Sequence, residues 1–250
     1  MFKRLVINSK DRLSSSNSSV DFTVQFKQLI DGCTCFELES AQIPNLFYNI
    51  TSANQWIDFN DGTALVSAQL AAGLYSLNGN TVSASILSEV GTAMTAASSG
   101  HGGLTFTATY SATTGLITIS GGGTTSFTLL FNSGSHSTTS AGYILGFGAV
   151  DYASATTQTA ANAPNLNAFN YLQISVNGYN SCLTTNNGFG TFVIPVNVNA
   201  GDIIIYNQLV NWKQTIPIAA PFNSLYVRLV VNNAVQSIQN ADWTLVLRVR

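Results

Sequence analysis

Hydrophobic and polar residues alternate with a period of two along much of this chain, and that alternation is typical of half-buried β-strands. It is clearest between Phe222 and Arg250, where two such runs flank a polar, Asn-rich connection. Their apolar faces comprise Leu225, Val227, Leu229 and Val231 in the first run and Trp243, Leu245, Leu247 and Val249 in the second. We expect the two runs to form a hairpin whose apolar side is covered by a second sheet.

Similar strands are expected near both ends of the chain. Besides the two closing runs, the pattern predicts strands at residues 3–7, 20–26, 33–43, 170–176, 191–196, 202–206 and 214–218, and shorter ones at 46–50 and 56–59. Pro44 ends the third of these strands, because proline cannot donate to the ladder. About eight antiparallel strands in two facing sheets is the strand count of a jelly roll. We therefore predict an all-β chain built on a single jelly-roll sandwich.

The middle of the chain has a different character. Apolar residues at helical spacing predict one helix from Ser85 to Ala97, with Ser85 as its N-cap and Gly100 as its end. Further strands are expected at 104–110, 116–120 and 127–131, and the aperiodic residues 151–167 predict a linker or surface arm. The predicted domains are a jelly roll at residues 1–51 and 166–250, and an inserted β-rich domain with one helix at residues 52–165.

The composition favours folding and burial between subunits. Only 8% of the 250 residues are charged, whereas 46% are hydrophobic, with fourteen Phe and nine Tyr. This apolar content can offset the entropy of ordering the backbone, so the chain is not expected to be disordered. A free monomer with so few charges would have poor colloidal stability. We therefore expect neighbouring subunits to cover much of its polar, uncharged surface.

The charges are unevenly distributed along the chain. All nine cationic residues lie within 3–27 and 213–250. The charged residues in the stretch between these segments are all acidic. The formal net charge of −2 argues against a dedicated nucleic-acid binder. Two interpretations are open for the basic terminal strands: salt bridges to Glu37 and Glu39, or a surface that faces something anionic.

Few residues offer catalytic chemistry. His101 and His136 are the two histidines, and a Ser-His-Asp combination around His136 and its neighbour Ser135 means little without geometry. Asp58 and Asp61 could approach the separation of glycosidase carboxylates, but an Asn-Asp-Gly turn explains Asp61 without catalysis. We predict that the chain is not an enzyme and has no catalytic, cofactor-binding or metal-binding residues.

Two further features have structural explanations. The glycine run 121–123 lacks the lysine and the following helix of a phosphate-binding loop, so it predicts a hairpin turn. Cys33, Cys35 and Cys182 are too few for a disulfide framework, and no second Cys or His pair completes a zinc site. Buried reduced thiols are expected.

The sequence predicts neither export nor a membrane span. The opening residues, MFKRLVINSKDR, contain too few apolar positions for a secretory signal, and no apolar run reaches the length of a transmembrane helix. Asn17-Ser-Ser and Asn49-Ile-Thr match the glycosylation acceptor pattern. Without an export signal, we interpret both as chance matches.

Several short motifs follow one another in a familiar order. They are Val6-Ile-Asn-Ser-Lys-Asp-Arg, a Ser-rich loop, Asp21-Phe-Thr-Val, Phe36-Glu-Leu-Glu-Ser-Ala-Gln-Ile-Pro-Asn, Tyr48-Asn-Ile, Gly73-Leu-Tyr-Ser before the helix, Leu145-Gly-Phe, Ser224-Leu-Tyr-Val-Arg-Leu and Ala241-Asp-Trp-Thr-Leu-Val-Leu. In this order they resemble vertex and minor capsid proteins of the single jelly-roll type found in virophages and large double-stranded DNA viruses. The low charge of this chain departs from what we expect of that family.

The resemblance implies a structural virion protein. Its expected role is that of a penton protein, which forms homopentamers at the five-fold vertices of an icosahedral capsid and contacts the major capsid protein. The insert would be available to a host receptor or glycan, and no cofactor or specific nucleic acid is expected. The charge distribution adds the hypothesis that the basic terminal sheet faces the capsid interior and the acidic insert faces solvent.

Other functions stay open at the level of the sequence. The chain could fill another minor capsid role. An aromatic-rich β-sandwich could also be a carbohydrate- or receptor-binding module, with Trp56 or Tyr110 in its binding face. A hydrolase would have His136 as its candidate base.

Overall fold

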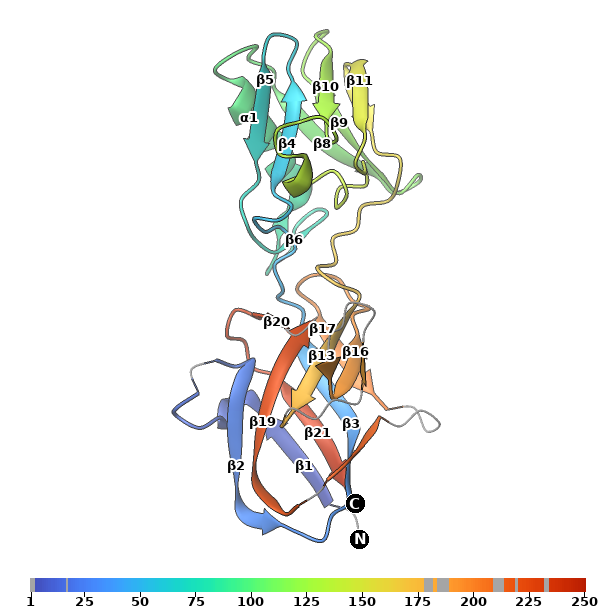
Figure 1. The fold of residues 1–250 in the computed structure, drawn as a ribbon. Helices are drawn as coiled ribbons and strands as arrows, with labels where there is room; N and C mark the ends of the chain where they lie inside the picture. Colours follow the sequence, from blue (N-terminus) through green and yellow to red (C-terminus); the bar gives the residue numbers. More distant parts are fainter. Residues whose placement is uncertain are drawn as a thin grey trace. The chain divides into compact units, whose positions relative to one another are not determined.

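The chain consists of two compact units. The computed structural model describes residues 3–16, 18–177, 182–183, 189–208, 214–218, 220–231 and 234–250. Unit 1 comprises Met1–Phe47 and Phe169–Arg250, and unit 2 comprises Tyr48–Ala168 (Figure 1). The domain boundaries predicted from the sequence lie after residues 51 and 165, a few residues inside unit 2. The division into a jelly-roll domain and an inserted domain stays a prediction.

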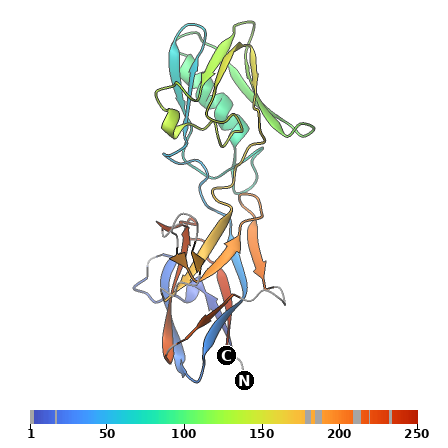
Figure 2. The same ribbon diagram turned by 45° about the vertical axis from the view of Figure 1, so that its right-hand side comes forward.

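Unit 1 is a sandwich of two antiparallel sheets (Figures 1 and 2). The β1 sheet has the order β1 (Lys3–Asn8), β21 (Thr244–Val249), β3 (Cys35–Pro44) and β17 (Ile203–Asn207), with β18 (Thr215–Pro217) pairing another part of β3. The β2 sheet has the order β16 (Phe192–Pro195), β13 (Tyr171–Val176), β19 (Phe222–Val231) and β2 (Asp21–Ile30), with β20 (Ala234–Val235) pairing β19. A short 3-10 turn, η1 (Ser9–Asp11), follows β1, and a short pair is formed by β14 (Cys182–Leu183) and β15 (Phe189–Gly190).

The strand connections are those of a jelly roll. If the eight strands on the two main paths are numbered in chain order, one sheet reads 1-8-3-6 and the other reads 2-7-4-5. Both sheets are antiparallel, and strands distant in sequence lie beside each other, as in two Greek keys. The predicted all-β class and single jelly roll are confirmed. Unit 2 enters the chain between the third and fourth of these strands, β3 and β13.

The predicted hairpin of the two closing runs is wrong. β19 pairs β2 and β13, whereas β21 lies between β1 and β3 in the opposite sheet. Period-two alternation specifies which face of a strand is buried, but not which strand lies beside it. Both apolar faces are nevertheless buried as expected, because they point from opposite sides into one core.

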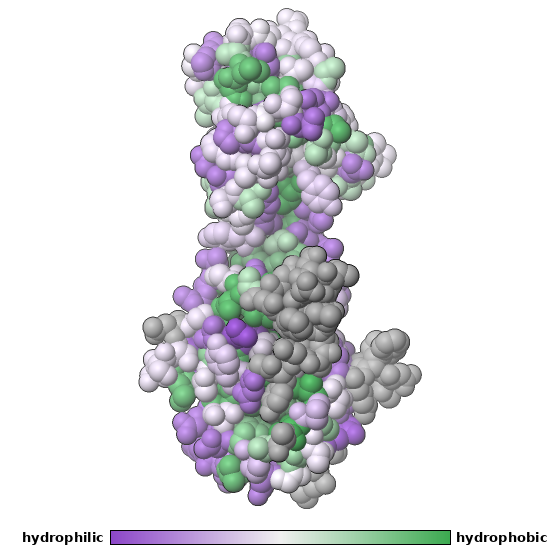
Figure 3. All heavy atoms as spheres, in the orientation of Figure 1, coloured by the Kyte–Doolittle hydropathy of each residue, from purple (hydrophilic) through white to green (hydrophobic). Residues whose placement is uncertain are grey.

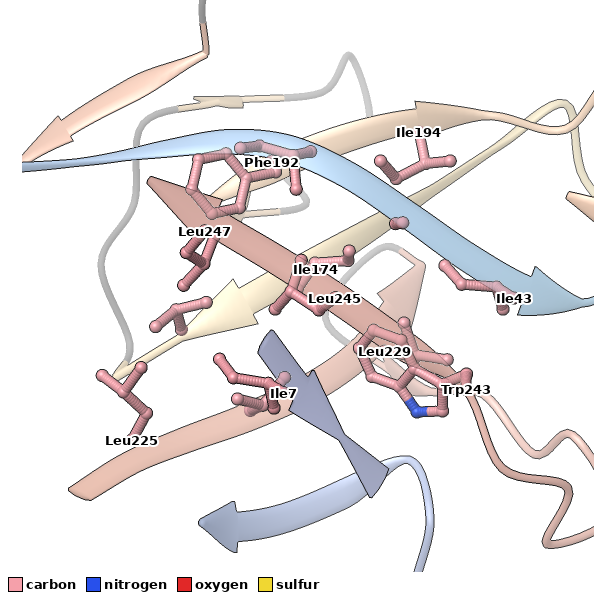
Figure 4. Close-up of a cluster of buried hydrophobic side chains, with 14 of the residues drawn as sticks. Ile7, Ile43, Ile174, Phe192, Ile194, Leu225, Leu229, Trp243, Leu245 and Leu247 are labelled. Atoms are coloured by element: carbon pink, nitrogen blue, oxygen red, sulfur yellow. The ribbon is translucent and has the colours of Figure 1, made fainter. Parts of the chain in front are cut away.

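The core of unit 1 lies between its two sheets. Figure 4 shows side chains from both layers meeting there, among them Ile7 and Leu245 from the β1 sheet and Ile174 and Leu229 from the β2 sheet. All four are almost completely buried. Burying one such side chain contributes roughly 1.5–3 kcal/mol, so this layer of apolar residues is the main stabilising element of the unit. The Trp243 indole N–H donates to the Ser19 carbonyl oxygen at 2.6 Å, which satisfies its one polar atom.

Unit 2 has two further sheets and a helix. The first sheet has the order β11 (Asp151–Ala155), β10 (Phe127–Leu130), β4 (Trp56–Asn60) and β5 (Leu65–Gln69), and the second has the order β12 (Thr157–Thr159), β9 (Leu116–Gly121) and β8 (Phe106–Ser111). Helix α1 (Ile86–Ser98) follows a short parallel pair, β6 (Tyr75–Ser76) and β7 (Ala84–Ser85), and a 3-10 turn, η2 (Ser137–Thr139), follows β10. The Ser85 hydroxyl accepts the Ser88 N–H, which confirms the predicted N-cap.

Two local predictions in this region are wrong. Residues 151–167 were expected to form a linker, yet they contain β11 and β12. The side chains of β11 are exposed or half-buried on both faces, so the strand has no hydrophobic alternation, and its order comes from the ladder with β10. The predicted strand at 46–50 is reduced to one isolated bridge between Ile50 and Gly73. The sequence also gave no indication of β5.

Candidate interaction surface

The outward face of the β1 sheet has exposed apolar side chains on both of its end strands. Alternation in β1 buries Leu5 and Ile7 and leaves Arg4 and Val6 outside, with Val6 65% exposed. A half-buried sheet normally presents polar side chains on this side. The exposed Val6 side chain departs from that pattern.

The other end strand of the sheet, β17, repeats this pattern. Ile204 is buried, whereas Ile203 and Ile205 are 56% and 57% exposed. Strand β17 pairs β3 in continuous register, so both exposed isoleucines lie on the same outward face. The run of three isoleucines is the signal in the sequence that could have identified this strand as an unusual edge.

Arginines and glutamates form a charged cluster at one end of the face. Arg4 binds the Glu39 carboxylate through Nε at 2.9 Å and Nη2 at 2.7 Å, which is a bidentate geometry. Arg248 Nη2 lies 3.4 Å from the same carboxylate, and Arg250 Nη2 lies 3.0 Å from Glu37. The predicted salt bridges between the basic terminal strands and Glu37 and Glu39 are confirmed.

A β-bulge places Glu39 among the arginines. The register of β21 against β3 pairs Val246 with Ser40 and Leu247 with Leu38, so Glu39 is the extra residue. Arg4 and Arg248 lie directly opposite each other on β1 and β21. Because like charges opposite each other are destabilising, the shared Glu39 carboxylate stabilises this arrangement.

The opposite end of the face carries a smaller polar cluster around Asp242. Its carboxylate accepts from the Ser9 hydroxyl at 2.9 Å and lies 3.3 Å from Arg12 Nη1 and 4.0 Å from Lys10 Nζ. The Trp243 N–H donates to the Ser9 hydroxyl oxygen. These contacts attach the turn after β1 to the chain entering β21. The centre of the face, between the two clusters, is uncharged.

Asp58, Ser135 and His136 are brought together, but not as a catalytic triad. Asp58 Oδ1 lies 2.9 Å and Ser135 Oγ 3.1 Å from the same ring nitrogen, His136 Nδ1. A triad needs the acid and the nucleophile on opposite ring nitrogens. Burial raises the pKa of Asp58, but hydrogen bonds from Ser67 and from the His136 backbone N–H and ring outweigh it and lower the pKa overall.

The same residues fix the loop that follows β10. The His136 ring stacks on Trp56 with centroids 4.0 Å apart and planes inclined by 11°. The chain at Gly134 runs close to Asp58, since a Cβ there would lie 2.5 Å from Asp58 Cβ and 2.5 Å from the Leu130 carbonyl oxygen. The Asp58 carboxylate therefore acts as a polar anchor for a tightly packed loop, with one face of Trp56 occupied by histidine.

Asp61 is a second structural carboxylate. It is buried, which opposes ionisation, yet hydrogen bonds from Thr63, Ala64 and Ser98 lower its pKa far below the ordinary range. The Gly102 N–H also donates to it at 3.1 Å. A glycosidase acid needs a raised pKa. Neither Asp58 nor Asp61 has one, so the carboxylate pair does not match that chemistry.

The remaining candidate residues also have structural roles or stand alone. Gly121 ends β9, and the Gly122 N–H donates to the Thr105 carbonyl oxygen. The predicted hairpin turn at residues 121–123 is wrong, because β9 and the next strand, β10, lie in different sheets. The Asn49 side chain is buried and bonds the backbone of Tyr75 and Leu166, so its amide is inaccessible to glycosylation. His101 is exposed in the turn after α1.

The structure describes the side chains of two of the three cysteines. Cys33 and Cys35 are free thiols and half-buried, rather than fully buried as expected. The side chain of Cys182, and Asn17, lie outside what the structure describes. Among the described residues, no group of three or more His, Cys, Asp or Glu could hold a metal ion. No described helix is long and apolar enough to cross a membrane.

The face of the molecule drawn in Figure 3 is weakly polar. Figure 3 shows one face on which residues of intermediate hydropathy predominate, with strongly hydrophilic residues in small groups. This appearance agrees with the 8% charged content.

No protein-family model and no curated protein matches the chain. Among solved structures, it is similar along its whole length to the crystal structure of selenomethionine-labelled mavirus penton protein, with a TM-score of 0.59, 11% identity, and coverage of 100% of this chain and 99% of that one. A chain of the cryo-EM structure of the Sputnik virophage aligns with a TM-score of 0.44, 12% identity, and coverage of 99% and 97%. The chain thus has the fold of the mavirus penton protein, and the predicted resemblance to virophage penton proteins is confirmed at the level of fold.

Proposed function

We propose that this chain is a penton protein, a structural virion protein that forms homopentamers closing the five-fold vertices of an icosahedral capsid. The observation that carries the proposal is the fold likeness to the mavirus penton protein, which spans 100% of this chain and 99% of that one. A shared jelly roll alone would be weak support, because that fold serves many functions. A likeness that includes the inserted unit is more specific.

The chemistry of the surface supports a role in assembly. Strands at both ends of the β1 sheet expose Val6, Ile203 and Ile205, and the centre of that face carries no charge. Removing water from such a face costs less free energy than removing it from a charged face, which favours contacts with other proteins. The candidate catalytic residues Asp58 and His136 are engaged in anchoring a loop. These observations support a structural role rather than an enzymatic one.

The partners and location follow from this role. The chain would reside in the virion, with copies of itself around the five-fold axis and the major capsid protein at its periphery. Unit 1 would serve as the capsid domain and unit 2 as an insert. Five copies around one axis require heterologous, ring-closing contacts.

The charge distribution suggests an orientation. Residues 48–168 contain four acidic residues and no Lys or Arg, whereas the remainder of the chain contains nine cationic and seven acidic residues. Unit 1, with the basic terminal strands, would face the capsid interior, and unit 2 would face solvent, where a receptor or glycan could reach it. A vertex reconstruction with unit 2 inside the shell would rule this orientation out.

The mass of the purified full chain in solution tests the proposal. Light scattering coupled to size-exclusion chromatography should give about five times the 26.5 kDa of one chain. A trimer would indicate a different minor capsid role, and a monomer at every concentration would contradict the pentamer. Mixing the chain with its major capsid protein and imaging the vertices would then test where it assembles.

A further inference from the structure

Strand β17 is an edge strand without the features that normally protect an edge. No strand among the described residues pairs with its outward side, which leaves backbone N–H and C=O groups open there. Natural proteins block such edges with proline, lysine, a bulge or a very short strand. Strand β17 reads Ile-Ile-Ile-Tyr-Asn and has neither proline nor charge, and its register with β3 is continuous.

The exposed apolar side chains favour pairing of this edge with another strand. Ile203 and Ile205 are both more than half exposed and lie on the same outward face of the β1 sheet. An exposed, apolar, regular edge strand templates the addition of another strand. Pairing with a strand of another chain would cover this edge in an assembled state.

Strand β1, at the other end of the same sheet, has complementary properties. It is also a terminal strand, and no described strand pairs with its outward edge. Val6 is 65% exposed on the same outward face. The exposed Lys10 follows β1, and the exposed Asp202 precedes β17.

The strand directions allow these two edges to meet. The pairings β1–β21, β21–β3 and β3–β17 are all antiparallel, so β1 and β17 run in opposite directions. A second copy can therefore place its β1 beside β17 of the first in an antiparallel ladder. In that arrangement the β1 sheets of the two copies have their outward faces on the same side. The first copy contributes its β17 edge to the contact, and the second contributes its β1 edge.

We propose that β17 of one copy of this chain is covered by β1 of a second copy, in a head-to-tail contact that extends the β1 sheet from subunit to subunit. Because the two edges differ, the contact is heterologous and can close a ring. This inference builds on the proposed penton function, since it names the surfaces by which its copies would associate.

The rows of paired residues across the β1 sheet indicate two registers for the contact between copies. Asn207, Ser40, Val246 and Val6 are successive partners in one row. If the row continues into the next copy without an offset, Val6 of that copy lies opposite Asn207. An offset of two residues would instead bring Val6 opposite Ile205. Directly opposite residues have Cβ atoms about 4.5–5.5 Å apart.

The first test introduces a charge on the edge. Ile205→Lys should increase the concentration at which oligomers dissociate by about tenfold or more, because an ammonium group would be placed in the contact. Leu65→Lys is the matched control, since Leu65 is 72% exposed on β5, the terminal strand of a sheet in unit 2. The control should assemble as the unmodified chain does. Both residues are exposed, and far-UV circular dichroism and thermal unfolding verify that each variant is folded.

The second test uses disulfide cross-linking in a background with Cys33→Ser, Cys35→Ser and Cys182→Ser. Val6→Cys combined with Asn207→Cys, or with Ile205→Cys, should give a ladder extending beyond the dimer on oxidation. Each single variant should stay uncrosslinked. A dimer from Ile205→Cys alone would indicate a symmetric β17–β17 contact and overturn the proposal.

The outcomes separate this inference from the penton proposal. A pentamer that neither dissociates with Ile205→Lys nor cross-links overturns the edge contact and leaves the penton function standing. An oligomer other than a pentamer that dissociates and cross-links as described supports the edge contact and contradicts the pentamer. A chain that is monomeric throughout, and that does not cross-link, contradicts both.

Discussion

Asp61 illustrates how a single residue can connect segments distant in sequence. Its carboxylate accepts hydrogen bonds from the Thr63 and Ala64 N–H groups in its own turn, and from the Ser98 hydroxyl at the end of α1. The Ser98 hydroxyl oxygen in turn accepts the Leu104 N–H. The Asp61 carboxylate and the Ser98 hydroxyl thus connect the turn between β4 and β5, the end of α1 and the chain just before β8. These contacts require the ionised Asp61 carboxylate, because every partner donates a hydrogen bond to it.

We predict that Asp61→Asn lowers the free energy of unfolding at pH 7 by on the order of 2 kcal/mol, because the amide presents hydrogens where donors converge. The Asp61 pKa is lowered in the folded protein, so its stabilisation is complete above the unfolded value of about 3.9 and is lost as the pH falls below it. The difference between the two proteins should therefore shrink from pH 7 to pH 3. Urea unfolding at both pH values measures it, and a constant difference would show that ionisation is not the cause.

Glu39 offers a second test at the residue scale. We predict that Glu39→Gln destabilises the chain by about 1 kcal/mol at low salt, since Arg4 and Arg248 would then face each other without their shared carboxylate. The effect should decrease in 1 M salt, where exposed charges are screened. Asp31→Asn, at an exposed acidic residue in the turn after β2, serves as the control. Equal effects of the two substitutions would contradict the cluster's role.

The sequence predicted the local part of these sites and missed the distant part. The Asn-Asp-Gly motif correctly indicated a turn at Asp61, because turn chemistry depends on neighbouring residues. The contact with Ser98 was not predictable, since nothing in the spacing of residues 61 and 98 specifies how α1 packs. Glu37 and Glu39 were predicted as partners of the basic strands, because a chain with so few charged residues offers few other acidic partners for its cationic side chains. The bulge at Glu39 had no signal.

At the scale of elements, periodicity predicted strands but not their neighbours. The alternation in β19 and β21 correctly identified the buried faces, as the burial of Leu225 and Leu247 shows. The pairing of these strands depends on β2, β13, β1 and β3, which are distant in sequence. Strand β11 was missed for the opposite reason: its partner supplies order that its own side chains do not signal.

The central position of β21 makes it the element on which unit 1 most clearly depends. We predict that removing residues 241–250 abolishes the cooperative unfolding transition of unit 1, because β1 and β3 would lose the strand between them and the core would lose Leu245, Leu247 and Trp243. Leu247→Ala is a milder companion and should cost about 2–5 kcal/mol. Hydrogen exchange resolved by segment measures both. Protection of β3 in the truncated chain at the level of the intact one would contradict the prediction.

At the scale of the whole molecule, the chain leaves unit 1 and returns to it at neighbouring points. Phe47 ends the first segment of unit 1 and Phe169 begins the second, and their rings pack edge to face with centroids 4.6 Å apart. Each unit has its own buried core. The sequence suggested this organisation through the change in pattern after the turn at residues 60–62. The limits of the two units depend on contacts that no local pattern specifies.

We predict that replacing residues 48–168 with about six Gly and Ser residues leaves unit 1 folded, because a short flexible loop can join two adjacent points at small entropic cost. The shortened chain should keep a β-sheet circular dichroism spectrum and a single cooperative transition, and residues 48–168 expressed alone should also unfold cooperatively. Since β1 and β17 both belong to unit 1, the shortened chain should keep the oligomeric state of the full chain. If it folds but no longer associates, the contacts between copies lie in unit 2; if it does not fold, the jelly roll requires its insert.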